Sequence, residues 1–227
     1  MNKIEELDAP TIQNDEEKIE FDISVEDFDI SQNYLETIED LDEKTIMYIE
    51  REIRNSYEYR AYIQYMKEEL DLTKCALLPS IDIKTTPVSL EFHHFPFTLF
   101  DVTSTIGKSM LEGLSEDETV SCFDISEAVM KEHYLNNVGL IPLTKTLHEM
   151  AHNGAIAIPF DKINGNYKKF IEKYEKHIEP DVVDRINALE KYNSTDEAKN
   201  FNDFKLKKRI VNYNVDYNRE SGDDDNV

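Results

Sequence analysis

The apolar residues between positions 46 and 71 recur four apart, which places them on one face of an α-helix. They are Ile49, Ile53, Tyr57, Ala61 and Tyr65. We interpret this partly aromatic stripe as core packing rather than as a surface that stacks on bases. Helical patterns also cover residues 103–114, 125–137 and 166–192, the last interrupted at Glu179-Pro180. The pattern therefore predicts a mainly helical domain.

A different pattern occupies the stretch before Pro96, where single apolar and polar residues alternate. Such alternation is typical of a half-buried β-strand. The alternating residues are Val88, Ser89, Leu90, Glu91, Phe92 and His93. Pro96 either ends this strand or confines it to a sheet edge, because proline has no backbone N–H to donate. The helices and this smaller β component together predict an α+β fold.

The chain of 227 residues has a formal net charge of −23, and the distribution of this charge divides the chain into three parts. Residues 1–45 contain 16 Asp and Glu against 3 Lys, a net charge of −13, and are predicted to form a largely disordered acidic arm. An alternative is a docking or DNA-mimicking segment, because spaced carboxylates imitate phosphates for a basic partner. Residues 46–192 are expected to fold as one domain, followed by an extension, 193–227, with an acidic tail.

The composition restricts the class of protein and the chemistry of any site. Hydrophobic residues make up 40% of the chain, which is enough for a packed core. We expect a cytoplasmic protein without a membrane partner, in the host cytoplasm if the protein is viral. The reasons are that no apolar run approaches the roughly 18 residues of a membrane span, and the first residues lack a secretory leader. Cys75 and Cys122 are the only cysteines, so any metal must be held by His, Asp or Glu.

Four of the six histidines form two close pairs, His93-His94 and His148 with His152. The second pair lies in the segment HEMAH, which matches the H-E-x-x-H pattern of zinc proteases, with Glu149 as the base. Residues at i and i+4 share one face of a helix, so several metal chemistries use such a pair. The two pairs together supply enough imidazoles for both a metal and a base.

The surroundings of HEMAH predict a helix of about three turns or less, whereas a zinc protease needs a long one. Asn153-Gly154 follows the second histidine directly and indicates a helix end, and Pro142 lies only six residues before the first. Ile158 also stands where the extended protease pattern has a third histidine. A protease is therefore the third choice of function. His133 and His177 have no such partners and are interpreted as surface or packing residues.

The same segments match a nuclease motif more completely. Residues 136–154 resemble the second half of HNH endonucleases, in which an asparagine precedes a short apolar strand and a helix carrying H-x-x-x-H. Residues 91–96 resemble the first half, a strand ending in a histidine doublet followed by proline. Together they are similar to the ββα-metal (His-Me) finger of the histidine-rich branch, and to HNH-type proteins of bacterial viruses. The resemblance covers residues 86–156 and implies a helical insertion at 102–135, because the family's loop is shorter.

The resemblance implies a metal centre and a nucleic-acid substrate. His93, His148 and His152 would bind one divalent metal ion, and three imidazoles suit zinc, nickel or manganese better than magnesium. The implied reaction is hydrolysis of phosphodiester bonds, with DNA as the partner. Weak candidates for phosphate contacts, which equally suit a solvated run, are Lys205, Lys207, Lys208 and Arg209.

The resemblance also implies two catalytic residues. His94 would be the general base that takes a proton from the attacking water. Asn137, or Asn136 in its place, would orient His94 by hydrogen bonding, although Asn137 suits a turn cap equally well. Neighbouring residues of a regular strand point to opposite faces, so His93 and His94 reach one site only where the strand ends.

The net charge opposes binding to DNA, because nucleases gain affinity from Lys and Arg that neutralise phosphates. Three explanations are compatible with the sequence: an autoinhibitory arm, a basic protein partner that delivers the DNA, or a finger that has lost activity and stabilises the fold. We expect a metal-dependent HNH-type endonuclease. The alternative is an acidic phage-type interaction protein, such as a DNA mimic or an inhibitor of a host DNA-binding factor, with a structural finger.

Overall fold

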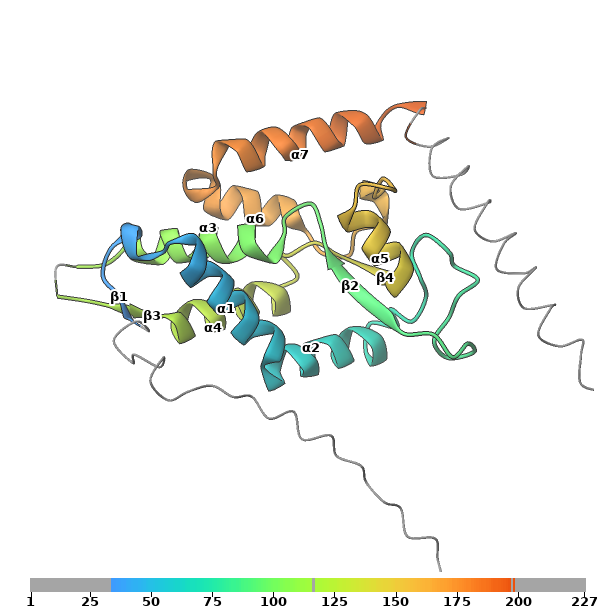
Figure 1. The fold of residues 1–227 in the computed structure, drawn as a ribbon, viewed down its shortest axis with the longest axis horizontal. Helices are drawn as coiled ribbons and strands as arrows, with labels where there is room; N and C mark the ends of the chain where they lie inside the picture. The colour runs from blue at the N-terminus through green and yellow to red at the C-terminus, as the bar shows by residue number, and fades with distance from the viewer. Residues whose placement is uncertain (1–33, 116, 197, 199–227) are drawn as a thin grey trace, which may run out of the picture. The chain divides into compact units, whose positions relative to one another are not determined.

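The computed structural model describes residues 34–115, 117–196 and 198 of the chain (Figure 1). The elements in chain order are β1 (Tyr34–Leu35), η3 (Ile38–Asp40), α1 (Glu43–Asn55), α2 (Tyr57–Glu68), β2 (Leu90–His94), α3 (Leu99–Glu112), β3 (Val120–Ser121), α4 (Cys122–Tyr134), β4 (Leu140–Thr144), α5 (Lys145–His152), η4 (Phe160–Lys162), α6 (Tyr167–Tyr174), η5 (Glu175–His177) and α7 (Pro180–Asn193). Helices dominate and both sheets are small, which confirms the predicted α+β fold. No helix of the described residues is long and apolar enough to cross a membrane.

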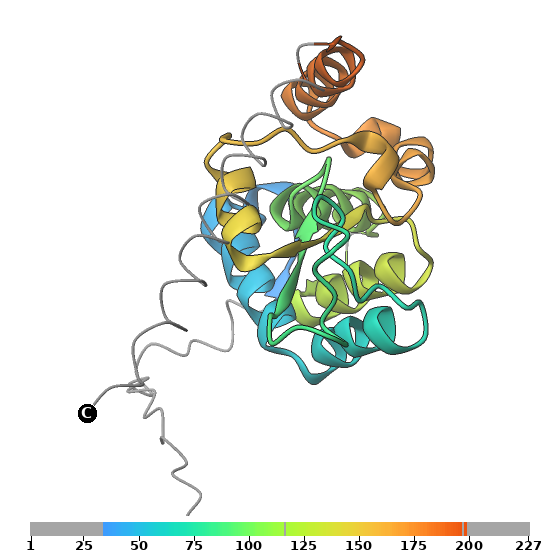
Figure 2. The same cartoon turned by 90° about the vertical axis from the view of Figure 1, so that its right-hand side faces the viewer.

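The larger hydrophobic core contains residues of α1, α3, α4 and α6, and α3 packs against the other three helices. Figure 2 shows the fold from the side. The side chains of Ile49, Ile53, Ile106, Ile125 and Phe170 are almost completely buried there. A second cluster lies between the β2–β4 hairpin, α5 and the segments that flank them, and it includes Leu143, Leu147 and Ile156. The hairpin therefore lies between two cores, one on each side.

The segment predicted as one helix from residue 46 to residue 71 is two helices, so this part of the prediction is wrong. The break falls at Ser56, whose backbone is extended. Its hydroxyl accepts a hydrogen bond from the backbone N–H of Tyr59 at 3.0 Å and so caps the N-terminus of α2. A serine at this position offers the backbone an alternative to continued helix, and the stripe of apolar residues does not reveal it.

Folded elements begin earlier than the predicted boundary of the acidic arm at residue 45. Tyr34–Leu35 pairs with β3, and α1 starts at Glu43. Leu35 and Leu41 are buried in the larger core, and Asp42 caps α1 by accepting a hydrogen bond from Thr45. The last apolar residues of the acidic run thus belong to the domain, and residues 1–33 lie outside the described part of the chain.

The predicted finger is a hairpin followed directly by a helix. β2 and β4 are antiparallel, with His93 opposite Ile141 and His94 opposite Leu140. The last residue of β4, Thr144, caps α5 through its hydroxyl, so no loop separates strand from helix. α5 has eight residues and ends at His152, which confirms the predicted short helix. The chain between β2 and β4 forms α3 and α4, as expected of a helical insertion.

Gly139 allows the two strands of the hairpin to approach closely at the end where the helical insertion joins them. A Cβ atom at this position would lie 2.1 Å from the carbonyl oxygen of Phe95, whose N–H donates to the Gly139 carbonyl. Replacing Gly139 with alanine is expected to lower the free energy of unfolding by about 1–3 kcal/mol, because backbone must move. Gly113→Ala is the control, since its Cβ meets only ordinary contacts. Equal stabilities of the two variants in denaturant unfolding would contradict this prediction.

Candidate metal centre

Alternation along β2 sends neighbouring side chains to opposite faces of the hairpin. Glu91 and His93 face α5, where both contact histidines of that helix. His94 faces the other way and contacts His133 of α4. The two members of the doublet therefore lie on different sides of the strand, as the period of two requires.

Three imidazoles converge between β2 and α5. His93, His148 and His152 each offer a ring nitrogen, and these three nitrogens lie within 4.8 Å of one another. The ring centroids are 5.0 Å apart for His93 and His148, 4.7 Å for His93 and His152, and 4.6 Å for His148 and His152. The three histidines that the resemblance assigns to a metal are thus brought together, and they form the histidine cluster.

Glu91 fixes the orientation of one ring in the histidine cluster. Its carboxylate accepts a hydrogen bond from Nδ1 of His148 at 2.6 Å. The proton of a neutral His148 then lies on Nδ1, and Nε2 keeps its lone pair. That Nε2 lies 3.2 Å from Nε2 of His152. A carboxylate behind a histidine in this way is the usual second layer of a metal site.

The geometry of the histidine cluster fits a divalent metal. Two metal–nitrogen bonds of about 2.0–2.1 Å at the tetrahedral angle hold their nitrogens about 3.3 Å apart, close to the Nε2 separation in α5. His93 is 9% exposed, and its Nδ1 is enclosed without a hydrogen-bond partner. A buried nitrogen without a partner is costly, and a metal ion would satisfy such an atom. The histidine cluster is open to solvent on the side of His152, because this residue is exposed.

Burial and neighbouring imidazoles favour the neutral forms that ligands require. Burial, with His148 and His152 nearby, lowers the pKa of His93 to about 4. The pKa of His148 is also lowered by burial and by His152, although Glu91 opposes this shift. The positive charge of Arg54 on α1 lowers the pKa of both rings further. Arg54 also pairs with Glu50 at 3.3 Å.

Replacing Glu91 with glutamine is expected to weaken zinc binding by about 10–100-fold, because His148 loses its orienting carboxylate. Zinc affinity is measured by competition with a chromophoric chelator. Glu149→Gln is the matched control, since Glu149 is an exposed carboxylate beside His148 in sequence, and it should keep the affinity of the unmodified protein. Equal losses of zinc affinity in the two variants would show that the Glu91 carboxylate does not contribute to zinc binding by orienting His148.

His94 lies in a buried aromatic environment outside the histidine cluster. It is 7% exposed, and its Nε2 is 3.0 Å from Nε2 of His133, which is 1% exposed. The ring of Tyr59 stacks against His94 with centroids 6.4 Å apart and an angle of 13°. Burial and His133 hold the pKa of His94 well below its usual value. His133 is therefore a partner of the doublet, and the interpretation of His133 as a surface or packing residue is incomplete.

The two asparagines at the end of α4 have structural contacts. Asn136 takes a left-handed backbone conformation, with φ of 58°, and its N–H donates to the carbonyl of His133. Asn137 donates from its side chain to Glu132 at 2.7 Å. Glu132 is 1% exposed and also pairs with Lys173 and Tyr174 of α6. Among the described residues Asn137 makes no hydrogen bond to His94, so the orienting role implied for it is not visible.

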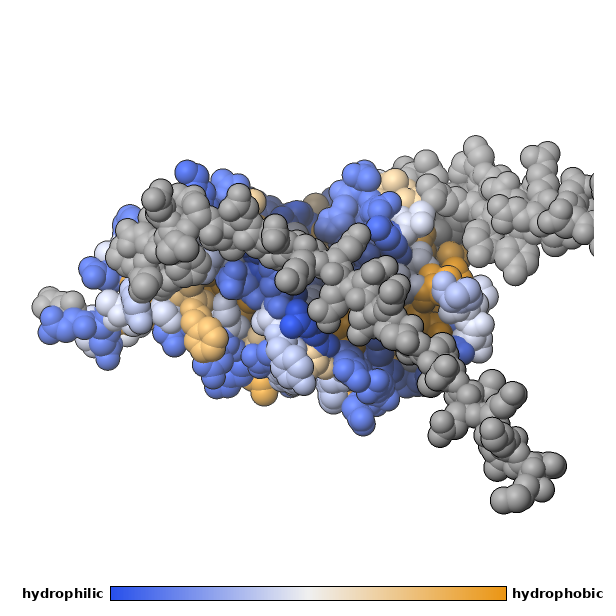
Figure 3. Space-filling view, turned by 60° about the horizontal axis from the view of Figure 1, so that its bottom comes forward, coloured by the Kyte–Doolittle hydropathy of each residue, from blue (hydrophilic) through white to orange (hydrophobic). Residues whose placement is uncertain are grey.

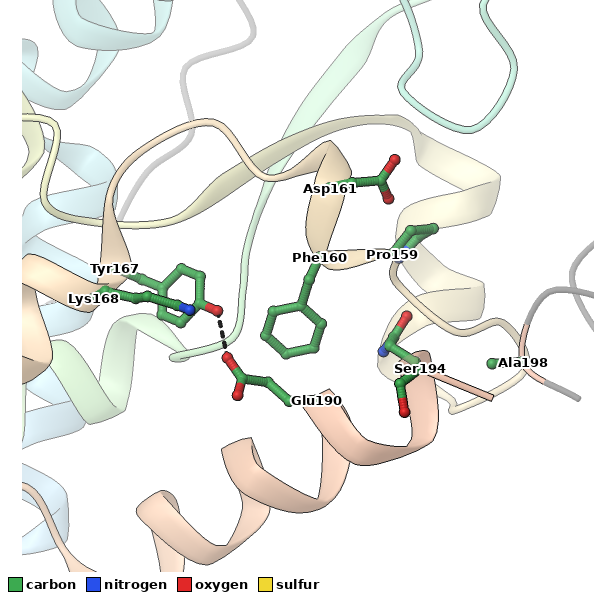
Figure 4. A pocket seen from close by; sticks show the side chains of 9 residues that line it. Pro159, Phe160, Asp161, Tyr167, Lys168, Glu190, Ser194 and Ala198 are labelled. Atoms are coloured by element: carbon green, nitrogen blue, oxygen red, sulfur yellow. Dashed lines mark hydrogen bonds between the residues drawn. The ribbon is translucent and has the colours of Figure 1, made fainter. Parts of the chain in front are cut away.

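One face of the molecule and one hollow outside the histidine cluster can also be described. The face drawn in Figure 3 is mostly hydrophilic where its atoms are described, with hydrophobic residues in separate small areas. A hollow of about 440 Å³ lies among η4, α6 and α7, and contains no residue of the histidine cluster (Figure 4). Tyr167 donates there to Glu190 at 2.6 Å. The weak phosphate candidates, residues 205–209, lie outside the described part of the chain.

Two residues of this region, Glu91 and His133, were not assigned a role from the sequence. Glu91 could have been found, because it stands two positions before His93 and so shares its strand face. Nothing along the chain indicates His133, which is 39 residues from His94 and meets it only through the packing of α4.

The fold and the histidine cluster define a mainly helical α+β protein with a hairpin and helix that form a candidate metal centre. The model of the bacteriophage G278-like virion protein family matches residues 1–219, and the chain belongs to this family. No curated protein and no solved structure matches the chain. Membership supports the phage origin that the resemblance suggested. A virion protein is part of the phage particle, a location that the expectation of a cytoplasmic protein did not include.

Proposed function

We propose that this virion protein hydrolyses phosphodiester bonds of nucleic acid with one divalent metal ion. The observation that carries the proposal is the convergence of His93, His148 and His152 from a β-hairpin and the helix that follows it. Three imidazoles with an exposed side suit a catalytic metal site, since structural sites are closed by a fourth protein ligand. Zinc, nickel and manganese suit these ligands better than magnesium.

In this proposal the residues divide the work between the two faces of the hairpin. A divalent metal supplies stabilisation of the charge on the phosphate and on the leaving oxygen. His93, His148 and His152 hold the ion, and Glu91 orients His148. His94 accepts the proton of the attacking water, a role that needs a neutral imidazole. Its side chain leaves the face of β2 opposite to the histidine cluster, so the proposal requires the substrate to reach both sides around the end of the strand before Pro96.

The charge of the chain restricts how the substrate arrives. A net charge of −23 repels nucleic acid at long range, so we propose that a basic protein partner delivers the DNA or that the arm regulates access.

The proposal is tested by nicking of supercoiled plasmid. The full chain is loaded in turn with zinc, nickel, manganese and magnesium, and a chelator-treated sample is the control. Cleavage is expected with at least one of the first three metals and should disappear with the chelator. Glu149→Gln should leave cleavage unchanged, whereas a metalloprotease would lose its activity. Absence of cleavage of plasmid, single-stranded DNA and RNA with all four metals would contradict the proposal.

A second candidate is an interaction protein of the virion in which the metal only stabilises the finger. The burial of His94 against His133 and Tyr59 favours it, because a general base must reach the substrate. In that case the acidic residues 1–33, which precede the folded elements, would bind a basic partner, and deleting them would abolish its capture. Substitution of His94 separates the two candidates, as argued in the Discussion.

A further inference from the structure

We propose that His133 of α4 is a positioning residue for His94, which holds its imidazole in one tautomer and one orientation. The inference rests on the proposed function, because it gives His94 the form that a general base needs. The two rings are joined by a hydrogen bond between their Nε2 atoms at 3.0 Å. They come from β2 and from α4, the second helix of the helical insertion.

The direction of this hydrogen bond follows from the other partner of His133. Nδ1 of His133 lies 2.8 Å from the carbonyl oxygen of Val129, one turn earlier in α4. A carbonyl oxygen only accepts, so Nδ1 of His133 carries a proton. A neutral ring has one N–H, and a charged ring at 1% exposure would be costly. Nε2 of His133 therefore accepts, and Nε2 of His94 donates.

This hydrogen bond leaves the lone pair of His94 on Nδ1. That atom has no hydrogen-bond partner among the described residues. Among the described residues, the fully enclosed side-chain atoms without a hydrogen-bond partner belong to His93, Thr103 and His177. Nδ1 of His94 is not among them, so this atom is not fully enclosed. The remaining exposure of His94, 7%, is consistent with an open Nδ1. Nδ1 is thus the atom at which His94 would take a proton.

Aromatic contacts restrict rotation of both rings. Tyr59 stacks on His94 and meets His133 with its edge at 6.2 Å. Tyr62, which is 2% exposed, packs against His133 with centroids 5.3 Å apart. A ring enclosed in this way keeps its hydrogen bonds in a fixed direction. Residues of α2 and α4 therefore hold the ring of His94 in place. Because α4 belongs to the helical insertion, the insertion contributes to the site.

The tautomer of His94 can be read by NMR without any cleavage assay. In the full chain labelled with ¹⁵N-histidine, two-bond ¹H–¹⁵N correlations distinguish a ring protonated at Nε2 from one protonated at Nδ1. His94 is expected to carry its proton on Nε2, and that proton should exchange slowly with water. In His133→Phe the protected Nε2 proton should be lost. In His133→Gln, whose amide oxygen can accept at the same place, it should be retained.

Cleavage by the same variants gives the second readout. His133→Phe is expected to lower kcat for nicking at least tenfold with unchanged zinc content, and His133→Gln should restore most of it. A wild-type His94 protonated on Nδ1, or a nicking rate unchanged in His133→Phe, would overturn the inference. If the wild type does not nick at all, the proposed function fails, while the tautomer in wild type and in His133→Gln still decides whether His133 positions His94.

Discussion

Replacing His148 and His152 together with alanine is expected to abolish stoichiometric metal binding and all metal-dependent cleavage. The two residues supply two of the three converging ring nitrogens, with Nε2 atoms 3.2 Å apart. The single imidazole of His93 cannot hold a metal ion against water at micromolar concentrations, because affinity depends on several ligands acting together. Bound zinc per chain is measured by elemental analysis after dialysis, on the samples used for nicking.

The control for this double variant is His177→Ala, which removes a histidine that pairs with Glu112 on α3 and lies outside the histidine cluster. It should retain zinc and cleavage. The double variant should also keep its helical circular dichroism, since His152 is exposed and the larger core does not include α5. Full zinc content in the double variant would show that the metal binds elsewhere in the chain.

Replacing His94 is expected to reduce cleavage by about 10²–10⁴-fold while leaving the metal content unchanged, the usual contribution of a general base. Metal retention follows from the geometry, because His94 faces α4 and the histidine cluster lies on the opposite side of β2. Both His94→Ala and His94→Gln should be made, since the ring is buried and glutamine preserves more of its volume.

The thermal stability and zinc content of both His94 variants are measured together with plasmid nicking. Loss of nicking in a folded variant that still binds zinc is the expected result. Unchanged nicking would exclude His94 as the base. A wild type that binds zinc but does not cleave, together with loss of partner capture on deletion of residues 1–33, would favour the interaction protein.

Much of the site could be predicted because its elements are local in sequence. Alternation before Pro96 indicates β2, and the i,i+4 histidines with Asn153-Gly154 indicate a short helix. The convergence of His93 with α5 needed one further assumption, that the two halves of the motif pair although 42 residues lie between His94 and Asn137. The antiparallel register of β2 and β4 agrees with that assumption.

The remaining features have two causes, tertiary packing and local capping. His133 contacts His94 only because α4 packs behind the hairpin. Asn137 donates to Glu132, five residues before it, and Glu132 in turn pairs with Tyr174 of α6. The break at Ser56 was hidden by an apolar stripe that continues through both helices. The sequence neighbours of His133 therefore give no information about its partner, whereas the cap at Ser56 is a local contact that the apolar pattern conceals.

The central claim is that His93, His148 and His152 bind one divalent metal ion. X-ray absorption at the zinc edge of the full chain, loaded with one equivalent of zinc, tests it most directly. We expect a four-coordinate ion with imidazole scattering from about three histidines at bond lengths of about 2.0–2.1 Å, and we expect this signal to be lost in His148→Ala/His152→Ala. A spectrum dominated by water and carboxylate oxygen, and unchanged in that variant, would contradict the account.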